Sequence, residues 1–207
     1  MTSDSPRDFG PLGRILGLAV IGLVLVAILV PVGALTFSVR VEGSSMAPTL
    51  VPGDRLLVNF LGRDDVRRFD VVEVDLPDGQ QIVKRVIGIP GDEIIVRNDG
   101  KQPVVLVTPA GESTQQRVDS PAWSAQWGDR AGQVCCSATG TTSTQPTALT
   151  IPADQYWVIG DNWGGSDDSR VYGLVKAEDI GAILNRRIQP FDRMGKVDNP
   201  ASLVPAS

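Results

Sequence analysis

The sequence predicts a mainly β domain behind a single N-terminal transmembrane helix. An uncharged apolar run near the N-terminus predicts the helix. From Arg40 onward, short apolar or alternating segments separated by turn tripeptides predict the β domain. The length of 207 residues is enough for one domain with a core and an appendage or two.

The helix is predicted over residues 15–37, which carry no charge. At about 1.5 Å per residue this run reaches about 35 Å, enough to cross a hydrocarbon core of about 30 Å. The alternative is a secretory signal peptide cleaved after Ala34, because Val32-Gly33-Ala34 supplies small residues. The run is long for a signal peptide and stays apolar past that point, so we favour a retained anchor.

The polar residues 1–14 are predicted to form a cytoplasmic tail, because Arg7 and Arg14 place positive charge on that side of the helix. Residues 38–188 are then predicted to form an extracytoplasmic domain.

Six strands are predicted in that domain, at Arg55–Phe60, Val71–Leu76, Ile82–Ile89, Ile94–Arg97, Val104–Val107 and Tyr156–Ile159. The turns between them are predicted at Pro52-Gly53-Asp54, Pro77-Asp78-Gly79, Pro90-Gly91-Asp92 and Asn98-Asp99-Gly100. Ala177–Ile183 is predicted as a short closing strand or a helical turn.

Two further segments have little core-forming pattern. Residues 108–148 are rich in Ser, Thr, Gly, Gln and Pro, which predicts an insertion. Residues 189–207 contain three prolines and few apolar residues, which predicts a flexible tail. Trp123 and Trp127 are either packed on the insertion, the reading that we favour, or anchored in the lipid interface.

The composition excludes several kinds of chemistry. The chain has no histidine, which rules out Ser-His-Asp and Cys-His catalysis and histidine-ligated zinc. Cys135 and Cys136 are adjacent, so there is no CxxC motif, and both free thiols and a vicinal disulfide remain open. The net charge of −5, without a cluster of Lys and Arg, argues against a nucleic-acid partner.

The stretch VEGSSMAPTL contains two adjacent serines, Ser44 and Ser45, in a turn-prone setting. A serine hydroxyl is a poor nucleophile until a base removes its proton. Without histidine, a carboxylate or a neutral lysine must act as that base. Lys84 lies in a predicted strand, on the face of Ile82 and Val86.

A neutral lysine needs a special environment, since an ordinary amine with a pKa near 10.4 is uncharged in about one molecule in a few thousand at pH 7. Burial among aliphatic side chains can lower that pKa by up to about 3–5 units. The alternative is a lysine that reaches from an edge strand to water, and strand position alone favours it. Arg85 lies on the opposite face, so the alternation allows one of the two cations to point inward and the other outward.

Four motifs change these odds: GSSMAPTL, GDRLLV, VKRVIGIPGD and GDNWGGSDDSR. In this order, behind one apolar span, they resemble the successive boxes of the bacterial type I signal peptidases, membrane-anchored proteases with a Ser/Lys dyad. The resemblance covers the anchor and most of residues 39–175, without the segment 108–148. It implies a β domain of antiparallel sheets and a retained anchor.

The resemblance also implies the site residues. Ser45, directly before Met46, matches the nucleophile, and its backbone N–H is implied as an oxyanion donor. Lys84 matches the general base. Ser166 is implied to orient the lysine amine, and Asp168 and Arg170 to form a supporting ion pair. Asp161 and Asn162 are implied to shape the turn. Met46 is implied to pack under the serine and to help line the substrate pocket.

The sequence departs from the family pattern at two places. Some members have a serine two positions before the nucleophile, whose hydroxyl helps to bind the oxyanion; here Gly43 stands there, as in the G-x-S-M subset. The second oxyanion donor is therefore unassigned, with Ser44 as a candidate. Trp163 and Gly164 replace residues that are common in the last box, at positions without a catalytic role.

The implied function is the removal of N-terminal signal peptides from exported preproteins, by cleavage after small residues such as Ala-x-Ala. The implied partners are preprotein signal peptides and the lipid bilayer of the cell membrane, with no nucleic acid, metal or cofactor. One alternative is the same dyad in a self-cleaving regulator that resembles the repressor peptidases, but the apolar span and the lack of a helix-turn-helix region argue against it. The other is a secreted β binding module in which Ser45 lies in a turn and Lys84 is an ordinary strand cation.

Overall fold

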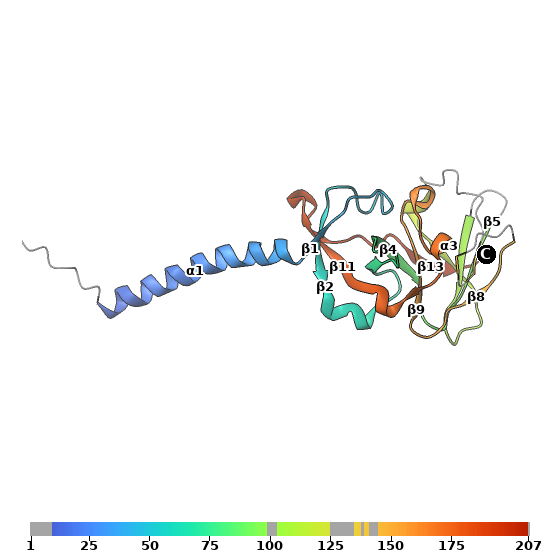
Figure 1. Cartoon of the computed structure of the whole chain (residues 1–207), viewed down its shortest axis with the longest axis horizontal. Helices are drawn as coiled ribbons and strands as arrows, with labels where there is room; N and C mark the ends of the chain where they lie inside the picture. Colours follow the sequence, from blue (N-terminus) through green and yellow to red (C-terminus); the bar gives the residue numbers. More distant parts are fainter. Residues whose placement is uncertain (1–9, 99–102, 125–134, 138, 141–144, 207) are drawn as a thin grey trace, which may run out of the picture. The chain divides into compact units, whose positions relative to one another are not determined.

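The computed structural model describes residues 10–98, 103–124, 135–137, 139–140 and 145–206 (Figure 1). The chain divides into two compact units, Met1–Ser38 and Val39–Ser207. The first contains the helix α1, Pro11–Thr36, whose 26 residues include Pro31. At about 1.5 Å per residue it is about 39 Å long, which confirms the predicted apolar helix and makes it long enough to cross a membrane.

The second unit is built mainly from two β-sheets. The first sheet has eight strands in the order β1-β2-β11-β3-β4-β9-β10, with β12 also paired to β11. Its strands are β1 Ser38–Arg40, β2 Arg55–Asn59, β3 Val71–Asp75, β4 Gln81–Gly88, β9 Gln155–Ile159, β10 Val175–Lys176, β11 Ile180–Gln189 and β12 Gly195–Lys196. The pairings β2–β11, β11–β3, β3–β4, β4–β9 and β9–β10 are all antiparallel.

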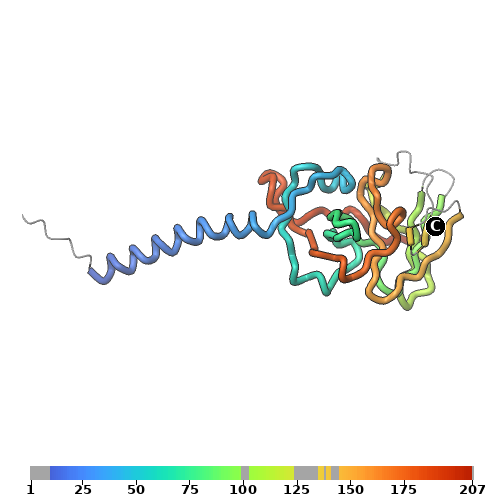
Figure 2. The backbone as a smooth tube through the Cα atoms, viewed as in Figure 1, coloured from blue at the N-terminus to red at the C-terminus, as the bar shows by residue number. Residues whose placement is uncertain are grey.

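The second sheet has five strands in the order β13-β7-β6-β5-β8. They are β5 Glu93–Asn98, β6 Pro103–Thr108, β7 Gln116–Asp119, β8 Leu149–Thr150 and β13 Ser202–Pro205, and all four pairings are antiparallel. The mainly antiparallel β architecture behind an N-terminal helix is therefore as predicted. Figure 2 follows the backbone through both sheets.

Short helical segments complete the second unit. They are η1 Phe60–Asp65, α2 Pro121–Ser124, η3 Trp163–Gly165, α3 Ser169–Tyr172, η4 Ala177–Asp179 and η5 Phe191–Arg193. The segment Ala177–Ile183 is thus a helical turn followed by the start of β11. The two predicted alternatives for it both occur, one after the other.

Strand β4 is covered on both faces, and this determines the environment of the site. Ile82 and Val86 belong to one buried cluster and Ile87 to another, which also contains Trp157 and Ile159 of β9. A third cluster joins Met46 and Leu50 of the loop after β1 to Leu56 and Leu184. Lys84 is 3% exposed and Arg85 1% exposed. The arrangement with one cation inward and the other outward does not occur, because both side chains are buried, although Gln81 at the start of β4 is exposed.

The segments 108–148 and 189–207 contribute to the fold more than their composition indicates. Val118 and Trp123 belong to the buried cluster that also contains Ile87 of β4 and Trp157 of β9. The expected flexible tail instead contains β12 and β13, and β13 pairs with β7 from Ser202 opposite Asp119 to Pro205 opposite Gln116. Two segments with weak local patterns order each other through backbone hydrogen bonds, which a local reading does not detect.

Candidate active site

The two serines lie in the loop between β1 and β2, and the packing of this loop distinguishes them. Ser44 is exposed and Ser45 is partly buried. Met46 is 1% exposed and Leu50 is fully buried, and the backbone N–H of Leu50 donates to the carbonyl of Met46 at 2.9 Å. The loop is therefore fixed to the core directly after Ser45. Met46 is buried in a core cluster, while its predicted packing under the serine and its part in a substrate pocket stay predictions.

Lys84 reaches Ser45 from the middle of β4. Its Nζ lies 3.0 Å from Ser45 Oγ and 3.1 Å from the carbonyl oxygen of Val83. Residues 39 positions apart are thus in hydrogen-bond contact. This is the distance that proton transfer between a nucleophile and its base requires.

Burial lowers the pKa of Lys84 from 10.5 to about 8. The main cause is desolvation, because burial removes water that stabilises the charged ammonium. The carboxylates of Asp168 and Asp167 act in the opposite direction, and Arg170 lowers the pKa further. At pH 7 roughly one molecule in ten then carries the amine uncharged, several hundred times more than for an ordinary lysine.

This shift predicts that Lys84→Met stabilises the fold near neutral pH. Below pH 8 the amine is charged in both the folded and unfolded states, so the folded state bears the full desolvation cost. Between pH 8 and 10.5 the wild type recovers that cost as the amine becomes neutral. We expect denaturant unfolding at pH 7 to give the variant a free energy of unfolding up to about 3 kcal/mol higher, with the gap closing towards pH 10.5.

The matched control is Lys176→Met, since Lys176 is exposed and bonded to Glu178. For Lys176→Met, we expect no gain in the free energy of unfolding at pH 7 that disappears towards pH 10.5. A Lys84→Met variant that is less stable than wild type by the same amount at pH 7 and at pH 10.5 would contradict a desolvation cost at Lys84.

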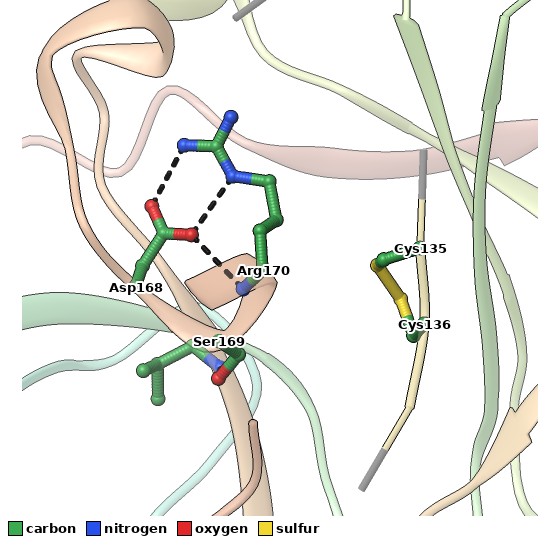
Figure 3. Close-up of a disulfide and its surroundings, with 6 residues drawn as sticks. Cys135, Cys136, Asp168, Ser169 and Arg170 are labelled. Carbon is green, nitrogen blue, oxygen red and sulfur yellow. Dashed lines mark hydrogen bonds and ion pairs between the residues drawn. A yellow bond between two sulfur atoms is a disulfide. The ribbon is translucent and has the colours of Figure 1, made fainter. Parts of the chain in front are cut away.

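Asp168 and Arg170 form the expected ion pair. Both are buried, with the Arg170 Nε donating to Asp168 Oδ1 at 2.8 Å and Nη2 donating to Oδ2 at 2.9 Å (Figure 3). Asp168 Oδ2 also accepts the backbone N–H of Gly160 at 3.0 Å. Arg170 Nη2 donates to the carbonyls of Trp163 and Ser166. The pair therefore ties the end of β9 to the loop that follows it.

Ser166 is fully buried in that loop and lies beside Gly160. A Cβ atom at Gly160 would come within 2.2 Å of Ser166 Oγ and 2.4 Å of the Ser45 carbonyl oxygen, so only glycine lets the two segments approach. Ser166 and Ser45 thus meet at Gly160. The hydrogen bonds described for the Lys84 amine go to Ser45 and Val83, and the lysine-orienting role of Ser166 stays a prediction.

Asp161 has a partner that the sequence did not reveal. Its carboxylate accepts two hydrogen bonds from Arg85, at 2.9 and 2.7 Å. Arg85 also donates to the carbonyls of Phe69 and Asp198 and to Asn199 Oδ1. The arginine of the KR pair thus connects the loop after β9 to the C-terminal segment. The two adjacent cations in the motif VKRVIGIPGD were visible in the sequence, but the burial of Arg85 and its partners, which are distant in the chain, were not.

The two cysteines form a vicinal disulfide (Figure 3), which decides between the two alternatives left open. Both lie in the core with Trp123. Trp123 is 3% exposed. Its ring packs edge-on against that of Trp163, with the two ring centroids 5.3 Å apart. Trp123 thus packs in the core against residues inside and outside the segment 108–148, and its burial argues against the lipid-interface alternative. Trp127 lies outside the described residues.

The oxyanion donors are defined only in part. The N–H of Ser45 stays the predicted first donor. At Gly43 an added Cβ would meet no atom within 4 Å, so space is open there, and the candidacy of Ser44 as second donor stays a prediction. Among the described residues, no group of three or more His, Cys, Asp or Glu is arranged to hold a metal ion.

Comparisons with known proteins point to one family. A family model described as signal peptidase, peptidase S26, matches residues 14–187. Signal peptidase I of Bacillus caldolyticus is 33% identical over 153 residues, covering 73% of this chain and 78% of that protein. Signal peptidase IB of Staphylococcus aureus (strain Mu50) is 30% identical over 168 residues, covering 77% and 81%. A crystal structure of a signal peptidase I from Enterococcus faecalis, 28% identical, aligns with 57% of this chain and 96% of that chain at a TM-score of 0.39.

Proposed function

The chain belongs to the signal peptidase family, peptidase S26, and from this premise we propose that it removes signal peptides with Ser45 as nucleophile and Lys84 as general base. The observation that carries the proposal is the 3.0 Å separation between Ser45 Oγ and the Nζ of a lysine that is 3% exposed. A buried amine at this distance has no evident structural use that would offset its desolvation.

The proposed reaction is acyl transfer in two steps. The neutral amine of Lys84 takes the hydroxyl proton as Ser45 Oγ attacks the carbonyl carbon of the scissile peptide. The N–H of Ser45 donates to the oxyanion of the tetrahedral intermediate. The Lys84 ammonium then gives its proton to the departing amine, and water hydrolyses the acyl-enzyme with Lys84 again as the base.

The proposed setting is the cell membrane. The helix α1 anchors the protein, residues 1–14 face the cytoplasm, and the β unit lies on the extracytoplasmic side. The substrate carries an apolar segment of its own, so enzyme and preprotein meet within one bilayer. The partners are thus preprotein signal peptides and lipid, and the proposed mechanism uses no metal.

The substrate preference is tested with a preprotein whose cleavage region reads Ala-x-Ala, incubated with the full chain in detergent. We expect cleavage after the second alanine, and a loss of at least about 100-fold in kcat/KM when that alanine is replaced by tryptophan, because a pocket shaped for a methyl group cannot admit an indole. EDTA is expected to leave the rate unchanged. Equal cleavage of both preproteins would contradict the small-residue preference, and loss of activity with EDTA would contradict the metal-free mechanism.

A further inference from the structure

One peptide unit at the site is held from outside its own loop. It joins Ser44 to Ser45, and Asn162 contacts it from the loop after β9. The side-chain Nδ2 of Asn162 donates to the Ser44 carbonyl at 3.1 Å, and the backbone N–H of Asn162 donates to the Ser45 carbonyl at 2.9 Å. The same asparagine thus binds two successive carbonyls of the nucleophile loop.

The orientation of the Asn162 amide follows from its other contact. Its Oδ1 accepts the backbone N–H of Gly165 at 3.1 Å, which only an oxygen can do. The opposite atom, Nδ2, must then be the one that faces Ser44. The backbone of Asn162 is fixed on both sides, because Asp161 pairs with buried Arg85 and the Trp163 carbonyl accepts from Arg170.

The bond to Ser44 acts on the group that matters for the chemistry. The C=O of Ser44 and the N–H of Ser45 belong to the same planar peptide unit, and in a trans peptide they point in opposite directions. Fixing the carbonyl therefore fixes the N–H. The Ser44 oxygen also accepts the N–H of Ala47 at 3.0 Å, so both of its lone pairs are used. Hydrogen bonds to a carbonyl also polarise the peptide and strengthen its N–H as a donor.

We propose that Asn162 is a positioning residue for the oxyanion site, which aims and polarises the Ser45 N–H through the Ser44 carbonyl. This rests on the proposed function, since it assigns Asn162 to the stabilisation of the oxyanion formed by Ser45. Its effect belongs to the transition state and not to substrate binding, because a ground-state carbonyl needs this donor less than an oxyanion does.

The test compares Asn162→Asp with Asn162→Ala in the full chain. The aspartate keeps an oxygen for the Gly165 N–H but removes the donor to Ser44, whereas alanine removes both. We expect both variants to lose about 10- to 100-fold in kcat with KM within about twofold of wild type, less than the loss of an oxyanion donor itself. Affinity for a peptide aldehyde, which forms a tetrahedral adduct with a serine hydroxyl, is expected to fall by the same factor.

Three outcomes would overturn the inference. These are wild-type kcat in Asn162→Asp with loss only in Asn162→Ala, a loss confined to KM, or unchanged aldehyde affinity in both variants. The first would leave Asn162 as a cap of its own loop, and tryptophan fluorescence separates all three from misfolding. Failure of the proposed function is distinguishable, because the wild type would then neither cleave the preprotein nor bind the aldehyde.

Discussion

Ser45→Ala is expected to abolish cleavage of an Ala-x-Ala preprotein, with a loss in kcat of at least about 10⁴-fold. The alanine removes the hydroxyl that lies 3.0 Å from Lys84 Nζ, so no acyl-enzyme can form. Ser45 is partly buried in a loop fixed by Met46, so the substitution is not expected to disturb the fold. Single-turnover cleavage by the full chain in detergent measures the loss.

The matched control for this prediction is Ser202→Ala, because Ser202 is exposed on β13. It is expected to cleave like wild type. If Ser45→Ala retained more than about a tenth of the wild-type rate, a different nucleophile would have to act, and the assignment of Ser45 would be withdrawn.

Lys84→Met is expected to lower kcat by about 10²–10⁴-fold, the usual contribution of a general base. The methionine has a similar length but cannot accept the Ser45 proton. Lys84→Arg is the sharper variant, since a guanidinium keeps the positive charge and does not deprotonate in proteins. Both variants are expected to be equally inactive if the amine acts as a base.

Lys176→Met serves as the control, as an exposed lysine lost from β10. Substantial activity in Lys84→Arg would contradict base catalysis and would assign Lys84 an electrostatic role. Together with the expected gain in stability of Lys84→Met, a loss of activity would show that the fold tolerates a costly amine for its chemistry.

The sequence predicted the strands well where turns bound them closely. The predicted strand at Ile82–Ile89 corresponds to β4, Gln81–Gly88, and the one at Tyr156–Ile159 falls within β9. Pro90-Gly91-Asp92 ends β4 as expected, with Gly91 at φ +86°. Strand β11 was only half predicted, because its second part contains Asn185, Arg186 and Arg187 and has no apolar alternation.

Long-range pairing was the main source of error in the fold. No local pattern indicates that β13 pairs with β7, since their registers depend on backbone hydrogen bonds between segments far apart in the chain. The buried state of Arg85 has the same origin. Its hydrogen-bond partners Asp161, Asp198 and Asn199 lie more than 70 positions away along the chain.

The candidate site was predicted by motif resemblance more than by strand position. The position of Lys84 in a strand favoured an exposed cation, and only the ordered motifs joined it to Ser45. The role of Asn162 in holding the Ser44–Ser45 peptide was not foreseen, because it depends on a loop-to-loop contact across 118 positions.

The central claim is that the amine of Lys84 is uncharged often enough near neutral pH to accept the Ser45 proton. An NMR titration of the Lys84 side chain in the full protein, assigned with Lys84→Met, tests it most directly. The account predicts a midpoint near pH 8. A midpoint at or above pH 10.5, the value for an ordinary lysine, would contradict it.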